Sequence, residues 1–254
     1  MNAGESLPVV QHDVEIQGNR QAWQRKPLLR DVYRRFHERI ATRLDRSHPG
    51  LIVELGSGMG SIKEVIPECV TTDIFPNPWL DRQENAYSLS FADESVSNLI
   101  LFDVWHHLRY PGSALAEFRR VLAPGGRVII FDPAISWTGR LVYGLFHHEP
   151  VGLGLEVTWT APDGFKPSDA DYFAAQGAAT RLFWRREDPA RLTGWELVEA
   201  TPLPSFEYFA TGGFSGPQLG GAGTFRFWRW LDRALARWPN LFAARLLVVL
   251  KRTP

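Results

Sequence analysis

The chain has 254 residues, of which 44% are hydrophobic and 22% charged, the composition of a soluble globular protein with enough chain for a full core. Lysine plus arginine and aspartate plus glutamate each number 28, and this balance argues against a chain built mainly to bind nucleic acid. The single cysteine, Cys69, excludes a disulfide framework and a cysteine-based zinc site. The sequence shows neither an apolar run of ~18 residues nor a secretory signal pattern, so we expect a cytoplasmic enzyme.

The N-terminal region divides into a polar segment and a helix. Residues 1–20 are polar, with Pro8 and Gly18, and this pattern predicts a loose arm or a lid. From 22 to 46 apolar residues recur at three- and four-residue steps, which predicts a helix ended by the His-Pro-Gly sequence at 48–50.

Short apolar runs then alternate with helical patterns. The runs cover residues 51–55, 69–73, 98–103 and 127–132. Three of them are apolar throughout rather than alternating, which is typical of parallel strands covered by helices on both faces. A helical pattern at 113–123 precedes the last run and is ended by Pro124, Gly125 and Gly126. We therefore predict an α/β fold with a doubly wound, mostly parallel sheet, whose ligands lie beyond the carboxyl ends of the strands.

The C-terminal half differs in composition, since 20 of the 32 aromatic residues fall within 134–254. Its pattern predicts a strand at 195–201, a glycine-rich turn at 212–223, a helix at 224–238 and a last strand at 246–251. We interpret 1–254 as one domain. Residues 22–133 form the N-terminal helix and the cofactor-binding half, and 134–254 form an aromatic cap plus the last strands.

A glycine loop follows the first strand directly, with the sequence Glu54-Leu-Gly-Ser-Gly-Met-Gly60. Glycines there allow a sharp turn and a close approach of backbone N–H groups to a ligand. Ser61 stands where a dinucleotide fold would place its third glycine, and the Lys-Ser/Thr of a P-loop is absent. Asp73 ends the second strand, where it can bind ribose hydroxyls. The expected ligand therefore carries a ribose but no obligatory pyrophosphate.

Between 51 and 133 these motifs, in this order, resemble the class I S-adenosylmethionine-dependent methyltransferases, in the broad group that includes quinone-, sterol- and sugar-modifying enzymes. The segment Asn85-Ala-Tyr-Ser-Leu-Ser-Phe91, the loop Phe102-Asp-Val-Trp-His-His-Leu108 and the stretch Arg120–Gly126 carry the rest of the resemblance. It implies S-adenosylmethionine as cofactor and a seven-stranded, Rossmann-like methyltransferase fold with an aromatic-rich C-terminal cap.

The resemblance also implies the residues that bind the cofactor: Glu54, Gly56, Ser57, Gly58, Gly60, Asp73, Ile74, Asn85, Ala86, Phe102 and Asp103. Asp73 would bind the ribose, Ile74 would pack on the adenine, and Asn85 replaces the family's aspartate at the adenine amino group. Other interpretations are a ligand-free turn for the glycines, a helix N-cap for Asp73 and a loop turn for Asn85. Glu54 would orient the cofactor's amino group or the loop amides, and Asp103 would bind the cofactor's ammonium or only end its strand.

The candidate catalytic residues are His106, His107 and Asp132. They follow the fourth and fifth strands, at the edge that faces the cofactor. Methyl transfer is largely a matter of alignment, but an oxygen acceptor must also lose a proton. A His-His plus Asp arrangement is similar to that of sugar O-methyltransferases in this group, which implies that one histidine takes the hydroxyl proton while Asp132 orients the imidazole or the acceptor. Alternatively, a histidine caps the following helix.

A second histidine pair, at 147–148, raises the question of a metal. Adjacent histidines rarely bind one ion together, and the carboxylate set that magnesium prefers is not recognisable in the sequence. We therefore expect no metal.

The helix expected near the C-terminus is amphipathic. Arg226, Arg229, Arg233 and Arg237 form one stripe, and aromatic and aliphatic residues take the other side. Such a helix, at 225–238, can make a weak peripheral contact with an anionic membrane. We favour the alternative that its apolar face packs on the sheet.

The sequence thus predicts a methyltransferase that acts at oxygen on a small-molecule, lipid-linked or glycan acceptor. One alternative is a nucleic-acid methyltransferase, although the Asn/Asp-Pro-Pro-aromatic motif of adenine-modifying relatives is absent. The other is a non-catalytic cofactor-binding module, which would not need to keep the glycine loop and Asp73. The oligomeric state is left open.

Overall fold

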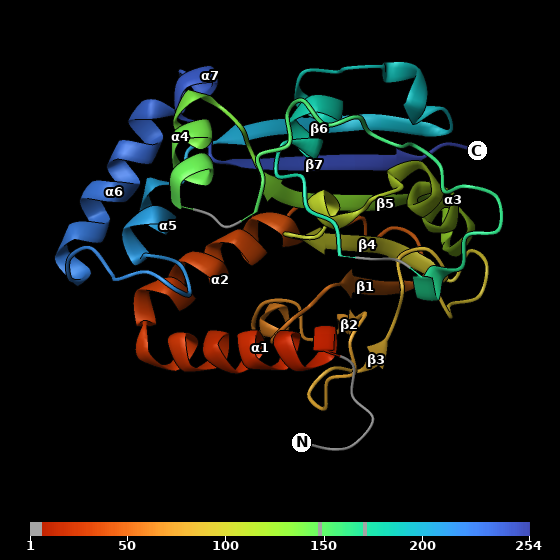
Figure 1. Ribbon diagram of the computed structural model, residues 1–254, viewed down its shortest axis with the longest axis horizontal. Coiled ribbons are helices and arrows are strands. Elements are labelled where there is room, and N and C mark those ends of the chain that lie inside the picture. The colour runs from red at the N-terminus through yellow and green to blue at the C-terminus, as the bar shows by residue number, and fades with distance from the viewer. Residues whose placement is uncertain (1–6, 147–148, 170–171) are drawn as a thin grey trace.

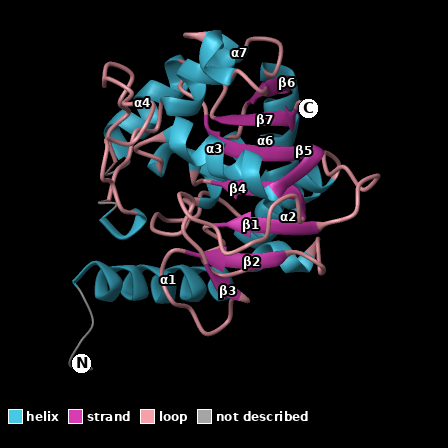
Figure 2. Ribbon diagram, turned by 90° about the vertical axis from the view of Figure 1, so that its right-hand side faces the viewer, coloured by secondary structure: helices cyan, strands magenta, loops and turns pink. Residues whose placement is uncertain are grey.

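The computed structural model describes residues 7–146, 149–169 and 172–254. Seven strands form one sheet in the order β3-β2-β1-β4-β5-β7-β6, and β7 runs antiparallel to both of its neighbours. Figure 2 shows the strands in this order, from β3 to β6. The strands are β1 (Leu51–Leu55), β2 (Val70–Asp73), β3 (Arg82–Gln83), β4 (Val96–Phe102), β5 (Leu122–Pro133), β6 (Trp195–Leu203) and β7 (Arg245–Arg252). The predicted seven-stranded, mostly parallel sheet is confirmed, and it takes strands from both halves of the chain.

Helices cover both faces of this sheet (Figure 1). The helices are α1 (Leu7–Arg25), α2 (Pro27–Ala41), α3 (Pro111–Val121), α4 (Trp137–Phe146), α5 (Phe206–Thr211), α6 (Ala222–Leu235) and α7 (Pro239–Phe242). Short helical turns lie at Ser61–Glu64, Trp105–His107, Pro167–Asp169, Thr180–Trp184 and Pro189–Leu192.

The core consists of two apolar layers, one on each face of the sheet. Because side chains alternate along a strand, Leu99 and Leu101 of β4 enter the layer that contains α3, whereas Ile100 and Phe102 enter the layer that contains α2. Strands β5 and β7 divide their side chains between the two layers in the same way. Both faces of these strands are therefore buried, which explains their continuous apolar runs.

The N-terminal region differs from the expected loose arm followed by one helix. Residues 7–25 form α1, and Pro27 begins a second helix, since proline removes a backbone N–H and is tolerated only at the first turn. Helix α2 ends at Ala41 rather than near residue 46, and the following loop is held by Asn98, whose amide donates to the carbonyl oxygen of Asp45. Ile16 of α1 is buried. The segment thus packs against the domain rather than standing free.

The segment after the glycine loop also differs from expectation. A helix was expected near 61–66, but the chain forms only the short turn Ser61–Glu64. A turn of this length has no helix dipole to offer a ligand, so any backbone N–H groups that bind one come from the loop itself.

Candidate functional site

The glycine loop lies at the carboxyl end of β1 and depends on its glycines. Gly56, Gly58 and Gly60 have φ values of 68°, 51° and 69°, in the left-handed region that side chains disfavour. At Gly56 there is a second reason, because a Cβ atom there would lie 2.4 Å from Cγ2 of Val104. The loop therefore packs closely against the segment that follows β4.

Asp73 joins this loop from the end of β2. Its Oδ2 accepts the N–H of Gly58 at 3.1 Å, and its Oδ1 accepts the N–H of Phe75 at 3.2 Å. Ser57 bonds to the backbone of Thr72 on the same strand, since its N–H donates to the carbonyl and its Oγ accepts the amide. Asp73, the residue predicted to bind the ribose, is thus in direct contact with the backbone of the glycine loop.

Glu54 is buried at the end of β1, beneath the loop. Burial raises the pKa of its carboxyl to about 7, helped by the charge of Asp73 and opposed by the Ser57 hydroxyl. The Ser57 side chain, which belongs to the loop, is the hydrogen-bond partner of this carboxyl, and the role of Glu54 toward the cofactor stays a prediction.

Helix α1 covers the glycine loop. A Cβ atom at Gly58 would lie 3.5 Å from Cδ1 of Ile16, and the carbonyl oxygen of Gly58 accepts bonds from Asn77 and Trp79. Between α1 and the loop there remains a hollow of about 460 Å³, within the size range of small-molecule sites. It is lined by Arg20, Trp23, Gln24, Met59, Gly60, Ser61, Lys63 and Glu64. Of the glycine loop, Met59 and Gly60 line this hollow, whereas Asp73 does not line it.

At the expected adenine end, Ile74 is 44% exposed and Ala86 packs partly against the core. The Asn85 side chain makes local contacts, since its Oδ1 accepts the N–H of Tyr87 and its Nδ2 donates to the carbonyl of Pro167. The first of these bonds is that of a turn residue. An amide oxygen has two lone pairs, so Oδ1 can still accept a second bond.

The candidate catalytic side chains form one buried cluster. Nδ1 of His106 lies 2.9 Å from Oδ1 of Asp132, and its Nε2 lies 3.5 Å from Oε2 of Glu149. Nδ1 of His107 donates to the carbonyl of Phe173 at 2.9 Å, and its Nε2 lies 3.6 Å from Oε1 of Glu149. The structure therefore brings together the three residues expected from the sequence and adds Glu149.

The two histidines have opposite electrostatic surroundings. Burial by itself would lower the pKa of His106, but the carboxylates of Asp132 and Glu149 outweigh it and raise the pKa to about 10. Burial, followed by the positive charge of His106, lowers the pKa of His107. Burial opposes ionisation of Glu149, but the bonds from His106 and Tyr172 hold the pKa of its carboxyl well below its usual range. At neutral pH, His106 is an imidazolium and His107 is neutral.

Asp103 contacts a residue that the sequence did not suggest. Its φ is 55°, and its Oδ1 forms an ion pair with the guanidinium of Arg245, which is buried at the start of β7. The Arg245 guanidinium also lies 4.7 Å from the ring centre of Tyr208. Phe102 turns its ring into the core and stacks on Tyr33 at 5.2 Å, so its side chain does not face the loop. Asp103 thus does more than end its strand.

Glu149 and Arg245 are the site residues missed from the sequence. Glu149 directly follows the second histidine pair, a signal that could have been used, whereas Arg245 is one more residue at the start of an apolar strand. Histidines 147 and 148 lie outside the described residues. Ligand atoms of His106, His107 and Glu149 lie within 4.8 Å of one another, as do those of Asp103, His106 and Asp132. The expectation of no metal thus overlooked a carboxylate beside the histidines.

Comparison with known proteins gives a family match over the centre of the chain. Residues 53–130, which include the glycine loop, Asp73 and both histidines, match the family model of a methyltransferase domain. The uncharacterized protein YafE of Escherichia coli (strain K12) is 45% identical over 51 residues, which cover 20% of this chain and 25% of that protein. The match therefore spans about a quarter of that relative's length.

Solved structures show the same fold over most of the chain. A chain of the complex between the Haloferax volcanii Trm112 methyltransferase activator and a methyltransferase has a TM-score of 0.53 at 15% identity, covering 95% of this chain and 96% of that one. The geranyl diphosphate C-methyltransferase of Streptomyces coelicolor has a TM-score of 0.51 at 11% identity, covering 85% and 75%. An S-adenosylmethionine-dependent methyltransferase of Thermotoga maritima has a TM-score of 0.51 at 15% identity, covering 91% and 95%.

Proposed function

Because this chain belongs to the class I S-adenosylmethionine-dependent methyltransferases, we propose that it methylates a hydroxyl oxygen of a small-molecule, lipid-linked or glycan acceptor. The observation that carries the proposal is the position of His107. Its side chain is one-third exposed, beside the buried pair of His106 and Asp132, at the edge of the sheet where the parallel strands end.

The cofactor would be held by the glycine loop and by Asp73, with Glu54 beneath them. Loop N–H groups and a carboxylate at the end of β2 are suited to the amino-acid and ribose parts of the molecule. When bound, S-adenosylmethionine supplies a methyl group on a sulfonium centre, which needs alignment with the acceptor more than activation.

His107 is the better candidate for the base. Its Nδ1–H donates to the Phe173 carbonyl, so in the neutral ring the lone pair lies on Nε2. Its lowered pKa keeps that nitrogen unprotonated at neutral pH. Nε2 can therefore take the acceptor's hydroxyl proton, and the Glu149 carboxylate, 3.6 Å away, would stabilise the resulting imidazolium.

His106 acts through His107 rather than on the acceptor. It is 3% exposed, and its ring lies between two carboxylates, with Nδ1 facing Asp132 and Nε2 facing Glu149. The two imidazole rings lie 4.1 Å apart, so a fixed His106 restricts where the His107 ring can go. Asp132 orients His106, as a carboxylate partner commonly does for a functional histidine.

The experiment is a search for methyl acceptors with purified protein. Release of S-adenosylhomocysteine is followed with free oligosaccharides, polyprenyl-linked saccharides, phenols, primary amines and RNA. Mass spectrometry of the product then locates the methyl group. The proposal expects an O-methylated product with a hydroxyl acceptor, and expects His107→Gln to lose turnover while it retains cofactor binding.

Two outcomes would overturn the proposal. Methylation of RNA with no transfer to any hydroxyl acceptor would favour a nucleic-acid methyltransferase. If calorimetry detected no binding of S-adenosylmethionine, the protein could not catalyse methyl transfer from this cofactor. The matched control is His48→Gln, a 40% exposed histidine side chain in the loop before β1, which should behave as the wild type.

A further inference from the structure

Helix α4 presents an apolar stripe to solvent. Trp137, Leu141 and Leu145 recur every four residues and therefore lie on one side of the helix. They are 68%, 59% and 69% exposed. Ordinary protein surfaces expose single, scattered apolar side chains. Three large ones in a row on one helix instead form a patch of the kind found at interaction sites.

Helix α6 and the turn after it present a second apolar face. Phe227, Trp230 and Trp238 are 51%, 59% and 49% exposed. Phe225 is buried, and Trp228 packs partly against the core. The interpretation that the apolar face of this helix packs inward therefore holds for Phe225 and Trp228 and is wrong for Phe227 and Trp230.

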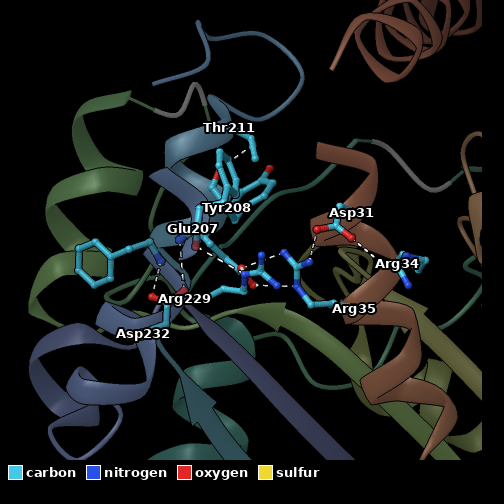
Figure 3. A network of polar contacts seen from close by, with 10 residues as sticks. Asp31, Arg34, Arg35, Glu207, Tyr208, Thr211, Arg229 and Asp232 are labelled. Atoms are coloured by element: carbon cyan, nitrogen blue, oxygen red, sulfur yellow. Dashed lines mark hydrogen bonds and ion pairs between the residues drawn. The ribbon is translucent and has the colours of Figure 1, made fainter. Parts of the chain in front are cut away.

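Polar contacts on the inner side fix the orientation of α6 (Figure 3). The Asp232 carboxylate accepts the N–H groups of Phe206 and Glu207, which begin α5. Nε of Arg229 lies 4.0 Å from Oε2 of Glu207, which also pairs with Arg35 of α2 at 2.8 Å. Because Asp232 and Arg229 point inward, Phe227 and Trp230 are held on the outer side.

The two apolar faces meet at α7. Leu241 of α7 is 43% exposed, and its carbonyl accepts the hydroxyl of Ser136, the residue before Trp137, at 3.1 Å. The N–H of Leu241 donates to the carbonyl of Trp238. We name the exposed apolar side chains of α4, α6, the turn after α6 and α7 the cap surface: Trp137, Leu141, Leu145, Phe227, Trp230, Trp238 and Leu241.

The exposed charged residues of α4 and of 222–242 have one sign. They are Arg140 on α4, Arg226 and Arg233 on α6, and Arg237 in the turn after α6, whereas Asp232, the one acidic residue within 222–242, points inward. Arg140 lies over the ring of Trp137 at 5.8 Å, and Arg237 over that of Trp238 at 4.8 Å. Tryptophan and arginine side by side are suited to the boundary between lipid headgroups and acyl chains.

We propose that the cap surface docks the protein on an anionic lipid bilayer, with the apolar side chains in the headgroup boundary and the arginines on lipid phosphates. Within the described residues no helix is long and apolar enough to cross a membrane, so the contact lies on the surface. The exposed charges of the cap surface are all positive, and an anionic lipid surface attracts such a cluster of arginines directly. Binding to a protein partner would not require that all of these charges have the same sign.

The cap surface also lies near the candidate site. Helix α4 begins shortly after the end of β5, which carries Asp132, and α7 ends shortly before β7 begins at Arg245. Figure 1 shows α4, α6 and α7 together at one end of the molecule. Docking would hold the site beside a lipid-linked acceptor. This last step rests on the proposed function, whereas the docking itself does not.

The experiment measures vesicle binding by co-sedimentation at low ionic strength. The probes are vesicles of phosphatidylcholine alone and vesicles that also contain phosphatidylglycerol. Wild-type protein should bind the anionic vesicles and be released by salt at about 0.5 M, where screening is nearly complete. Phe227→Ser/Trp230→Ser and Leu141→Ser/Leu145→Ser should each weaken binding by about tenfold or more, since each removes two apolar anchors.

The matched control is Leu155→Ser/Val198→Ser, which removes two side chains that are 44% and 48% exposed outside the cap surface. It should bind as the wild type does. Equal binding by the anchor variants, or none by wild-type protein, would overturn the proposal. A wild-type dimer that ignores vesicles and dissociates in Phe227→Ser/Trp230→Ser would assign the surface to a second copy instead. Calorimetry with the cofactor confirms that each variant is folded and separates this test from that of methyl transfer.

Discussion

Nδ1 of His106 and Oδ1 of Asp132 lie 2.9 Å apart and both side chains are buried, so the charge of this histidine is coupled to folding. The ordinary pKa of 6.5 applies to the unfolded chain, and the folded value is raised to about 10. A raised histidine pKa contributes stability that is complete below pH 6.5 and is lost as the pH rises toward 10.

We therefore expect the free energy of unfolding to fall between pH 6.5 and 10, by on the order of a few kcal/mol more than in His106→Asn. Urea denaturation at a series of pH values measures both proteins. The variant has no titratable group at position 106, so its curve gives the pH dependence of stability that comes from all other titratable groups. Parallel stability curves for the two proteins would show that His106 is not charged in the folded state.

The sheet could be predicted from the sequence because each strand is marked by an apolar run within its own few residues. The runs around Val53, Ile100 and Ile129 are apolar on both faces, and the same residues are buried by helices in the structure. The glycine loop is also local, since Gly56 and Gly60 need only their own backbone angles and immediate neighbours.

The rest depends on contacts between distant segments. Within 14–25, the part of α1 whose side-chain burial is described, only Ile16 and Ala22 are buried, and two buried residues six positions apart give no clear apolar periodicity. Glu149 and Arg245 join the site from remote positions in the chain. The orientation of α6 follows from polar partners on α5, whereas its sequence is aromatic over most of its circumference.

Replacement of His107 by glutamine should lower kcat by about 10²- to 10⁴-fold, the usual contribution of a general base. Cofactor affinity should stay near that of the wild type, because His107 contacts Phe173 and Glu149 rather than the glycine loop. The pH profile of turnover adds a second readout. In wild-type protein the rate should fall only at a pH lower than 6.5, the ordinary histidine pKa, because the pKa of His107 is lowered, and this limb should disappear in the variant. Normal turnover in both His106→Ala and His107→Ala would refute the acid–base roles.

Replacement of Asp73 by alanine should weaken S-adenosylmethionine binding by about 10- to 100-fold, since hydrogen bonds to a charged group contribute ~1.5–3 kcal/mol. Part of this loss of affinity would come from the glycine loop, because Asp73 also accepts the N–H of Gly58 and so helps to hold the loop in place. Titration calorimetry measures the affinity. Asp163→Ala, at an exposed position, is the control and should bind like the wild type. Unchanged affinity in Asp73→Ala would show that the cofactor does not lie along this loop.

Replacement of Asp103 by asparagine should destabilise the fold by about 3–5 kcal/mol, because it leaves the buried Arg245 guanidinium without its carboxylate. Asparagine tolerates the positive φ of 55° at this position, so backbone strain does not confuse the result. Denaturant unfolding at pH 7 gives the difference. Arg34→Gln, which breaks exposed ion pairs on α2, should cost far less. Equal losses would mean that the Asp103–Arg245 pair is not essential to the packing of this edge of the sheet.

Removal of divalent metal should leave turnover unchanged, although ligand atoms of His106, His107 and Glu149 lie within 4.8 Å of one another. Both carboxylate oxygens of Glu149 already accept bonds, one from the Tyr172 hydroxyl and one from the Gln176 amide. The imidazolium of His106 occupies the space between two carboxylates that a cation would need. Methyl transfer also requires no Lewis acid when a base takes the proton.

The measurement is turnover after exhaustive dialysis against a chelator, compared with turnover after addition of zinc, manganese or magnesium. Stimulation by one of these ions in wild-type protein, together with its absence in His107→Gln, would contradict the prediction. The three side chains would then be metal ligands, and His107 would no longer be the base. Inhibition by zinc alone would agree with the base proposal, because a bound ion blocks the lone pair on Nε2 of His107.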